Sequence, residues 1–358
     1  MRLVNKLLYC LAAGIPAVAL AACSSGGSGG VASGPPPEQS SIVIDAVPTA
    51  DAAGLYIAQD NGYFAQQGLK VTIAPIHGGE YGIGDLQTGK AQLIEGNYVS
   101  FILAQIAGTF AAPNPSNPAL PPEPARPINM RLIADSSQMQ PGNQGLYVLP
   151  SSPYRTVQDL VRHNVKVGVN SLHNIGAVFL GALLASNNYK VDALEESPQV
   201  LPLMPQLLAK HVISAAWLPE PFATLAQQQY GAVQVADFDQ GSLQNFPIGT
   251  IGGSSAWVQS HPNTVAAFLR AYNEGQQVAD TNRSQVEAAL VKNGVVPPAG
   301  SGITPAEVAA TMTLDTYPLV MDVPVMQRVA DAMYEFGVIG KPYSISKMIQ
   351  QEPGIING

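Results

Sequence analysis

The sequence predicts an α/β fold divided into two lobes. Residues 41–73 begin with an apolar strand, pass through a polar turn and an apolar helix, and end in a strand of alternating apolar and polar residues. Such a unit lays its two strands side by side in parallel, with the loop at the carboxyl edge of the sheet. Strands and helices keep alternating further along the chain, and 358 residues are enough for about two domains.

The first helix is expected over Leu55–Ala58. It should end at Gly62, because glycine accepts a left-handed C-cap without a Cβ clash. The turn Thr49–Asp51 before this helix should contribute to a ligand site. The aromatic residues of the unit should instead pack the helix on the sheet; they are Tyr56, Tyr63 and Phe64.

The secondary structure of four further segments can be predicted from their residue patterns. Residues 175–186 are patterned as a helix, and a second clear helix begins at Pro262. Residues 77–82 are rich in glycine and predict a turn, whereas residues 248–258 predict a pair of strands that returns to the first lobe.

The N-terminus has the pattern of a targeting segment. Two basic residues precede the apolar run Leu7–Leu20, which is short for a membrane span of about 20 residues. The following Leu20–Cys23 resembles a bacterial lipobox, in which the cysteine is acylated and becomes the new N-terminus. Lipid on Cys23 would anchor the protein to the extracytoplasmic face of a bacterial membrane, because each buried methylene contributes about 0.8 kcal/mol.

Cleavage before Cys23 changes what the composition allows. Loss of Arg2 and Lys6 lowers the formal net charge from −8 to −10, and Cys10 leaves with the leader. No thiol then remains for a disulfide, a cysteine metal site or a cysteine nucleophile. The acidic balance argues against nucleic acid as a partner.

The chain divides into four predicted parts. Residues 24–41 are rich in Ser, Gly and Pro and predict a flexible tether. The proline-rich segment 111–127 predicts an exposed loop, since proline can lie neither inside a helix nor in a central strand. The predicted boundaries are a signal segment 1–22, a tether 23–41, lobe 1 from 42–138 and 245–358, and lobe 2 from 139–244.

Catalytic and metal-binding motifs are missing from the sequence. Gly252–Ala256 lacks the closing glycine of a serine-hydrolase elbow, and the five histidines follow no metal-ligand spacing. No phosphate-binding loop of the G-x-x-x-x-G-K-[ST] type occurs. We therefore expect no enzyme activity, no cofactor and no metal site.

Several short motifs carry a family resemblance. Gly54, Tyr56, Ala58, Gly62–Phe64, Gly68–Leu69 and Val71 form a segment similar to the opening of a family of periplasmic-type substrate-binding proteins. Ala216–Phe222 and His261–Ala271 resemble two later motifs of that family, although Ser214-Ala215 replaces its usual Asp-Ala. This family serves ABC importers for nitrate, sulfonates, taurine and thiamine-pyrimidine precursors. The resemblance implies a two-lobed periplasmic-binding-protein-like fold with a ligand cleft between the lobes, and ABC permease subunits as partners.

The loops at the carboxyl ends of the predicted strands should line that cleft. They contain aromatic rings, acids, amides and hydroxyls, and His173 is their only possible cation. Aromatic rings could stack a flat ligand, and acids could accept hydrogen bonds from ring amines. The predicted ligand-binding residues are Asp51, Glu80, Tyr81, Asn97, Tyr98, Ser171, Asn174, Trp217 and Glu220.

This loop composition favours an aromatic or amine-bearing heterocycle, such as a thiamine-pyrimidine precursor. A sulfonate, taurine or nitrate-type anion stays open as an alternative, because helix N-termini bind anions through backbone N–H groups alone. A second alternative is an enzyme of the pyrimidine-precursor synthase branch, which resembles this family but carries a cysteine-rich iron motif. A third is a surface adhesin that uses the proline-rich loop as its contact.

Overall fold

The computed structural model describes residues 34–106, 127–297 and 302–349. The predicted signal segment 1–22, Cys23 and all but the last residue of the proline-rich segment 111–127 lie outside these ranges. Among the described residues, no helix combines the length and the hydropathy needed to cross a membrane.

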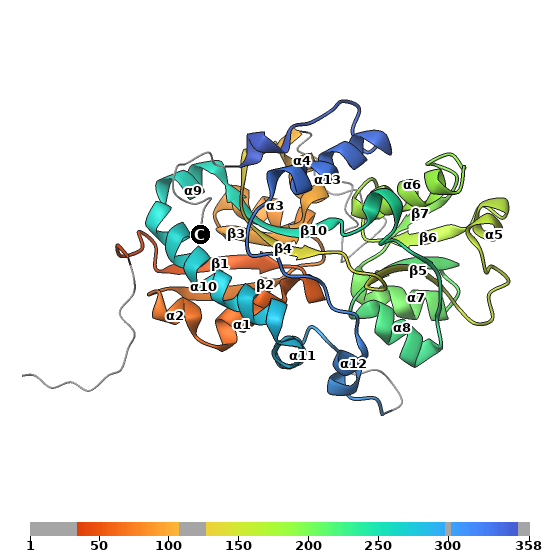
Figure 1. The fold of residues 1–358 in the computed structure, drawn as a ribbon, viewed down its shortest axis with the longest axis horizontal. Helices are drawn as coiled ribbons and strands as arrows, with labels where there is room; N and C mark the ends of the chain where they lie inside the picture. The colour runs from red at the N-terminus through yellow and green to blue at the C-terminus, as the bar shows by residue number, and fades with distance from the viewer. Residues whose placement is uncertain (1–33, 107–126, 298–301, 350–358) are drawn as a thin grey trace, which may run out of the picture. The chain divides into compact units, whose positions relative to one another are not determined.

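The first lobe is built on a five-stranded mixed sheet with the strand order β2-β1-β3-β10-β4 (Figure 1). Strand β1 pairs in parallel with β2, as the βαβ unit predicts, and also with β3, whereas β10 runs antiparallel to both of its neighbours. The strands are β1 (Ser41–Ala46), β2 (Lys70–Pro75), β3 (Leu93–Asn97), β4 (Met130–Gln138) and β10 (Pro247–Ser254).

The first helix confirms the prediction that a helix follows the polar turn and ends at Gly62. Helix α1 (Ala53–Asp60) ends before Gly62, which has a φ of 74°. The ring of Phe64 in α2 (Tyr63–Gln66) stacks on Phe268 at 5.2 Å between centroids and so joins α2 to α10 (Pro262–Thr281). The other helices around this sheet are η1 (Ala50–Ala52), α3 (Gly79–Thr88), α4 (Tyr98–Ile106), α9 (Ser255–Ser260), α11 (Arg283–Lys292), α12 (Pro305–Thr311), α13 (Val323–Glu335) and η4 (Ile345–Met348).

Two local predictions are wrong. The segment 77–82 is not a turn throughout, because α3 begins at Gly79. A Cβ on Gly82 would lie 2.8 Å from Ile94 Cδ1, so the small residue allows α3 to approach β3 closely. Residues 248–258 form one strand and one helix, since the Ser254 side chain accepts a hydrogen bond from the Trp257 N–H and caps α9.

The second lobe has its own five-stranded mixed sheet, in the order β7-β6-β8-β5-β9. Strand β6 pairs in parallel with β7 and β8, and β5 runs antiparallel to β8 and β9. The strands are β5 (Gln144–Val148), β6 (Lys166–Val169), β7 (Glu195–Pro198), β8 (Ala215–Pro219) and β9 (Val233–Asp237). The helices are α5 (Val157–Arg162), α6 (Ile175–Ser186), η2 (Leu201–Leu203), α7 (Met204–Ala209), α8 (Phe222–Tyr230) and η3 (Gly241–Leu243).

The chain passes between the two sheets after β4 and again before β10. The segment before α13 runs beside the first of these connections. Gln138 forms an antiparallel bridge with Thr316, and the Asn143 amide donates to the Asp315 carboxylate. The lobe boundaries themselves, at 138/139 and 244/245, stay a prediction.

The end of the predicted tether contacts the first lobe. The Glu38 carboxylate accepts hydrogen bonds from the N–H groups of Asn263 and Thr264 at 3.0 and 2.8 Å. Trp257 Nε1 donates to Gln39 Oε1 at 3.0 Å. Glu38 thereby supplies acceptors to free N–H groups at the start of α10, and the chain is held to this helix before β1 begins.

Candidate functional site

A pocket lies where the carboxyl ends of the parallel strands from both sheets meet. It offers about 40 Å³ to the centres of water-sized groups, which is room for about three waters. A ring-sized ligand therefore needs the walls to move apart. The lining residues come from the loops and strand ends of both lobes: Val47, Thr49, Asp51, Gly78, Glu95, Gly96, Asn97, Ile248 and Gly249 from the first, and Gln144, Asn170, Ile175, Leu201, Trp217 and Pro219 from the second.

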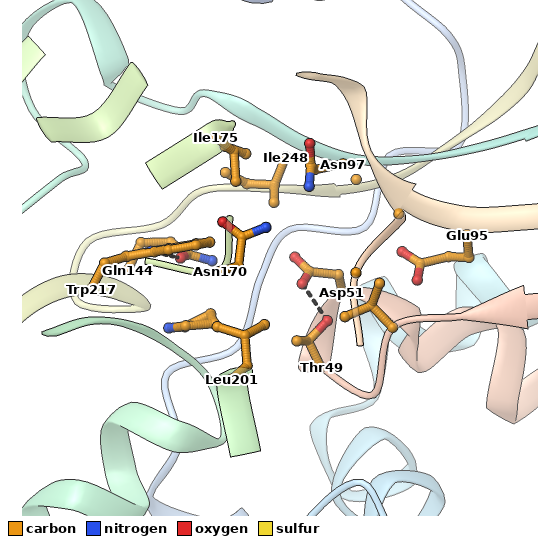
Figure 2. A pocket seen from close by; sticks show the side chains of 15 residues that line it. Thr49, Asp51, Glu95, Asn97, Gln144, Asn170, Ile175, Leu201, Trp217 and Ile248 are labelled. Atoms are coloured by element: carbon orange, nitrogen blue, oxygen red, sulfur yellow. Dashed lines mark hydrogen bonds between the residues drawn. The ribbon is translucent and has the colours of Figure 1, made fainter. Parts of the chain in front are cut away.

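Two carboxylates form the wall on the first lobe. Asp51 lies in η1 and accepts hydrogen bonds from Thr49 Oγ1 at 2.5 Å and from Ser137 Oγ at 2.6 Å. Glu95 lies on β3, is 1% exposed and accepts from Ser136 Oγ at 3.0 Å. Its carboxylate points toward Asp51 across the pocket wall (Figure 2).

Burial raises the pKa of both acids above its ordinary value. For Glu95 the pKa rises to about 8, through burial first and the neighbouring Asp51 carboxylate second. Burial also raises the pKa of Asp51, although the hydroxyls of Ser137 and Thr49 oppose this change. Glu95 therefore exchanges its proton near neutral pH rather than near pH 4.

An indole ring and two amides form the wall on the second lobe. Trp217 is 3% exposed, and its Nε1 donates to Gln144 Oε1 at 2.9 Å. Phe179 of α6 packs edge-on against this indole at 5.6 Å between ring centroids. The Asn170 side chain extends into the pocket between this wall and Asp51 (Figure 2). The ring is thus held firmly, with the amides beside it.

Of the nine residues predicted to bind ligand, three line this pocket: Asp51, Asn97 and Trp217. Tyr98 and Ser171 are buried completely. Tyr81 is partly buried, with its ring edge-on to His77 at 5.8 Å.

Two more of the predicted residues lie at a contact between the lobes. Ser100 Oγ of α4 donates to Glu80 at 3.2 Å and receives a hydrogen bond from the Asn174 amide of the second lobe at 3.1 Å. The Asn174 side chain also accepts from the Ile175 N–H at 2.7 Å and so caps α6. These residues link the lobes next to the pocket.

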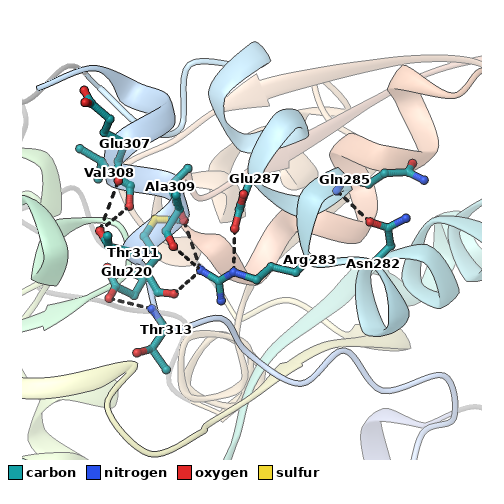
Figure 3. Close-up of polar contacts among 12 residues, drawn as sticks. Glu220, Asn282, Arg283, Gln285, Glu287, Glu307, Val308, Ala309, Thr311 and Thr313 are labelled. Carbon is teal, nitrogen blue, oxygen red and sulfur yellow. Dashed lines mark hydrogen bonds and ion pairs between the residues drawn. The ribbon is translucent and has the colours of Figure 1, made fainter.

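The Glu220 carboxylate is hydrogen-bonded to other residues of the protein (Figure 3). Its carboxylate accepts from the hydroxyl and N–H of Thr224, at 2.8 and 3.1 Å, and from the Thr313 N–H at 3.3 Å. Burial raises the pKa of Glu220 to about 7. Nearby, Arg283 donates to the carbonyl of Met312 at 2.7 Å, just beyond the end of α12. Glu220 therefore connects β8 and α8 to the segment that follows α12.

Several lining residues were not predicted, above all Glu95, Gln144 and Leu201. The sequence shows Glu95 as one residue of a strand, and nothing local tells which strand residues reach the pocket. Its one usable signal is a charge inside an apolar strand, because buried acids are rare unless they are paired or functional. Gln144 is the first residue of β5.

The arrangement can bind a small polar ligand with a flat face. It offers an indole ring, amide groups and carboxylates in a recess between two lobes. Among the described residues, no group of three or more His, Cys, Asp or Glu side chains could hold a metal ion.

Comparison with known proteins identifies the fold and the family. A model described as "NMT1/THI5 like" matches residues 49–106, and one described as "NMT1-like family" matches residues 149–292, together more than half of the chain. A search of curated proteins gives no significant match.

Solved structures with this fold include transport proteins. The alkanesulfonate-binding protein SsuA from Xanthomonas axonopodis pv. citri, bound to MOPS, has a TM-score of 0.68 at 16% identity and covers 87% of this chain and 99% of its own. The periplasmic nitrate-binding protein NrtA from Synechocystis PCC 6803 has a TM-score of 0.66 at 15% identity, covering 87% and 85%.

A third similar structure is the Candida albicans CA3427 gene product, described as having the generic periplasmic binding protein fold, with a TM-score of 0.64 at 12% identity. It covers 87% of this chain and 96% of its own. The two lobes and the pocket between their sheets agree with the fold of these structures and with the family matches. The chain therefore belongs to the NMT1/THI5-like family and has the two-lobed α/β fold of periplasmic binding proteins.

Proposed function

We propose that this protein captures a small solute in the pocket between its lobes and delivers it to an ABC importer. The observation that carries the proposal is the pocket at the carboxyl edges of both sheets, where open α/β folds bind ligands. The lobes would separate to admit the solute and close on it by bending at their connections. The sulfonate- and nitrate-binding proteins of similar fold support a transport role.

The ligand we propose is an amine-bearing aromatic heterocycle, such as a thiamine-pyrimidine precursor. Trp217 supplies a flat ring on which a heterocycle can stack, and its position is fixed by Phe179 and Gln144. The Asn97 and Asn170 amides can match the donors and acceptors around a ring.

A compact anion is the second candidate ligand, because two proteins of similar fold are described as binding alkanesulfonate and nitrate. Turnover of the ligand would point instead to the third candidate, an enzyme of the pyrimidine-precursor synthase branch.

A thermal-shift screen of the purified protein tests the transport proposal. Aminopyrimidines, flavins, sulfonates, taurine and nitrate are added in turn, and native mass spectrometry identifies any solute that co-purifies. A true ligand present at 100 times its Kd should stabilise the protein by about 2.7 kcal/mol and raise the melting temperature accordingly. If every compound leaves the melting temperature unchanged and no solute co-purifies, the proposal fails.

Replacing Trp217 by phenylalanine should weaken ligand binding by at least tenfold. Phenylalanine keeps a ring but is smaller, and it cannot donate to Gln144. Trp257→Phe is the matched control, because Trp257 stacks on His261 and bonds to Gln39 outside the pocket. The sequence has two tryptophans, so the control also makes Trp217 the sole indole, whose fluorescence should change on titration. Equal affinities of the two variants would contradict this placement of the ring.

We also propose that lipid on Cys23 anchors the protein to the extracytoplasmic face of the membrane. The lipobox-like sequence Leu20–Cys23 motivates this proposal. Cys23→Ser should move the protein from the membrane fraction to the soluble extracytoplasmic fraction while leaving ligand affinity unchanged. Metabolic labelling with a fatty acid should mark the natural protein alone, and labelling of both would rule out Cys23 as the acylated residue.

A further inference from the structure

The hydroxyl donors around the pocket are already in use. Thr49 and Ser137 donate to Asp51, and Ser136 donates to Glu95. The indole N–H of Trp217 donates to Gln144. An anionic ligand needs several hydrogen-bond donors, and these four would have to be withdrawn from their present acceptors to serve it.

Two acceptors of the pocket wall, in contrast, are free. Glu95 Oε2 and Asn170 Oδ1 are buried and make no hydrogen bond of normal geometry to any described residue. Both side chains belong to the pocket wall, and each is less than 5% exposed. Buried acceptors are almost always satisfied in folded proteins, so the Asn170 oxygen indicates a hydrogen bond that a ligand supplies. Glu95 Oε2 can accept a second such bond once the carboxyl has lost its proton.

The helix N-termini at the pocket carry acceptors from the protein itself. Asp51 lies in η1, directly before α1, and Glu80 lies in the first turn of α3. The Asn174 side chain accepts from the Ile175 N–H at the start of α6. Helix N-termini are the sites where this kind of fold could hold an anion without a basic residue. At the start of α6 the Asn174 amide already occupies that role, and Asp51 and Glu80 place acidic side chains at the starts of α1 and α3.

The part of the pocket wall that the structure describes carries acids without a basic side chain beside them. Among the described residues that line the pocket there is no lysine, arginine or histidine. Four titratable groups lie close enough to Glu95 for their charges to interact with its carboxylate. They are Asp51 from η1, Tyr56 from α1, Tyr272 from α10 and Asp315 from the segment before α13. None of the four can supply positive charge.

From the free acceptors, the used donors and the lack of a basic side chain among the described lining residues, we infer that the solute presents a cationic N–H group to Glu95 and Asp51. An amidinium or a protonated aminopyrimidine has this chemistry, with two N–H donors that match a carboxylate. The inference rests on the proposed solute-binding function and specifies the charge of the solute. It favours the amine-bearing ligand over the sulfonate or nitrate alternative.

Binding of a cation should release a proton. Burial raises the pKa of Glu95 to about 8, so a large share of this carboxyl is protonated at pH 7 before a cation binds. A cation next to it favours the carboxylate and lowers that pKa, whereas an anion would raise it further. The direction of proton exchange therefore distinguishes the two classes of ligand.

Three probes with one ring and different charges test the inference. Benzamidine, benzamide and benzoate are titrated into the protein by calorimetry at pH 7, in two buffers of different ionisation enthalpy. We expect benzamidine to bind at least tenfold more tightly than benzamide and to release up to one proton. Its affinity should increase between pH 6 and pH 8, by up to tenfold per pH unit. Benzoate should bind more weakly than benzamide.

Glu95→Gln isolates the carboxyl group. Glutamine keeps the acceptor for Ser136 but cannot become negative, so the preference for benzamidine and the proton release should both disappear. Asp135→Asn is the matched control: burial raises the pKa of Asp135 to about 8 as well, but this residue does not line the pocket. The control should keep both properties. Asp51→Asn provides a second test if the glutamine variant does not fold, and it should lower the benzamidine affinity.

The outcomes separate this inference from the proposed function. Benzoate binding as tightly as benzamidine, or proton uptake with benzamidine, overturns the inference and leaves solute capture intact. If none of the probes binds, the charge of the co-purified or screened solute decides: a cationic solute supports the inference, and a neutral or anionic one overturns it. If no solute binds at all, the proposed function fails first.

Discussion

Replacing Gly275 by valine is expected to prevent the first lobe from folding. Gly275 lies where α10 crosses α1, and a Cβ there would overlap the carbonyl oxygen of Gly54. It would also lie 2.8 Å from Ala58 Cβ and 2.9 Å from Ala58 N. Most of these are backbone atoms of α1, so the clash can be relieved only by moving a helix. Overpacking of a core typically costs about 1–3 kcal/mol, and a branched side chain against backbone exceeds that range.

Two alanine variants, Gly275→Ala and Gly84→Ala, compare a crowded glycine with an uncrowded one. Gly275→Ala should lower the free energy of unfolding by about 3 kcal/mol. Gly84 is an exposed residue of α3, and a Cβ there would meet nothing within 4 Å. Its replacement should stabilise the protein by about 0.5–1 kcal/mol, since alanine favours the helix. Urea denaturation measures both changes, and a Gly275→Ala protein as stable as the natural one would disprove the close helix crossing.

The protein should be most stable in mildly acidic solution and should lose stability as the pH rises from 5 to 8. Burial raises the pKa of Glu95 and of Asp135 to about 8 and that of Glu220 to about 7. Unfolded, these acids titrate near pH 4. Between the two values the folded state binds more protons, so the free energy of unfolding falls by at most about 1.4 kcal/mol per pH unit for each group.

Calorimetric melting between pH 4.5 and pH 8.5 at constant ionic strength checks this slope. Below pH 4 the trend should reverse, because hydrogen bonds at helix N-termini lower the pKa of Asp159 and of Glu307. Asp135→Asn should flatten the decline by the contribution of one proton. A melting temperature that stays constant or increases from pH 5 to pH 8 would show that these acids are ionised in the folded state.

Local sequence signals predicted much of the fold because they act over a few residues. Helix α6 spans 175–186 as expected, since Asn174 caps its first N–H and an apolar run follows. The parallel pair of β1 and β2 follows from the strand-helix-strand pattern, with Gly62 in the left-handed conformation that ends α1. Each of these features is decided by neighbours in the chain.

The wrong predictions arose where tertiary contacts override local preference. Glycines at the start of α3 favour a turn by propensity, but Gly82 is needed for close packing against Ile94. Trp257 and Val258 read as strand residues, and only the cap from Ser254 shows that a helix begins there.

The site was harder to predict than the fold because it is assembled from both sheets. Loop positions pointed to Asp51, Asn97 and Trp217, which do line the pocket. The alternation of residues along β3 does not reveal that Glu95 lies at the pocket. Strand pairing and sheet packing decide which residues of a strand reach the pocket. Tyr98 begins α4 and is buried, although it directly follows a strand end.

Strand β10 limits the order in which the two lobes can be completed. It lies between β3 and β4 in the first sheet and is the only described strand that bonds to β4, yet it is encoded more than 100 residues after β4 begins. Until β10 arrives, β3 and β4 present open edges of the kind that invite aggregation. The second sheet uses residues 144–237 alone. A chain that emerges N-terminus first therefore contains every strand of the second sheet before it contains the strand that completes the first.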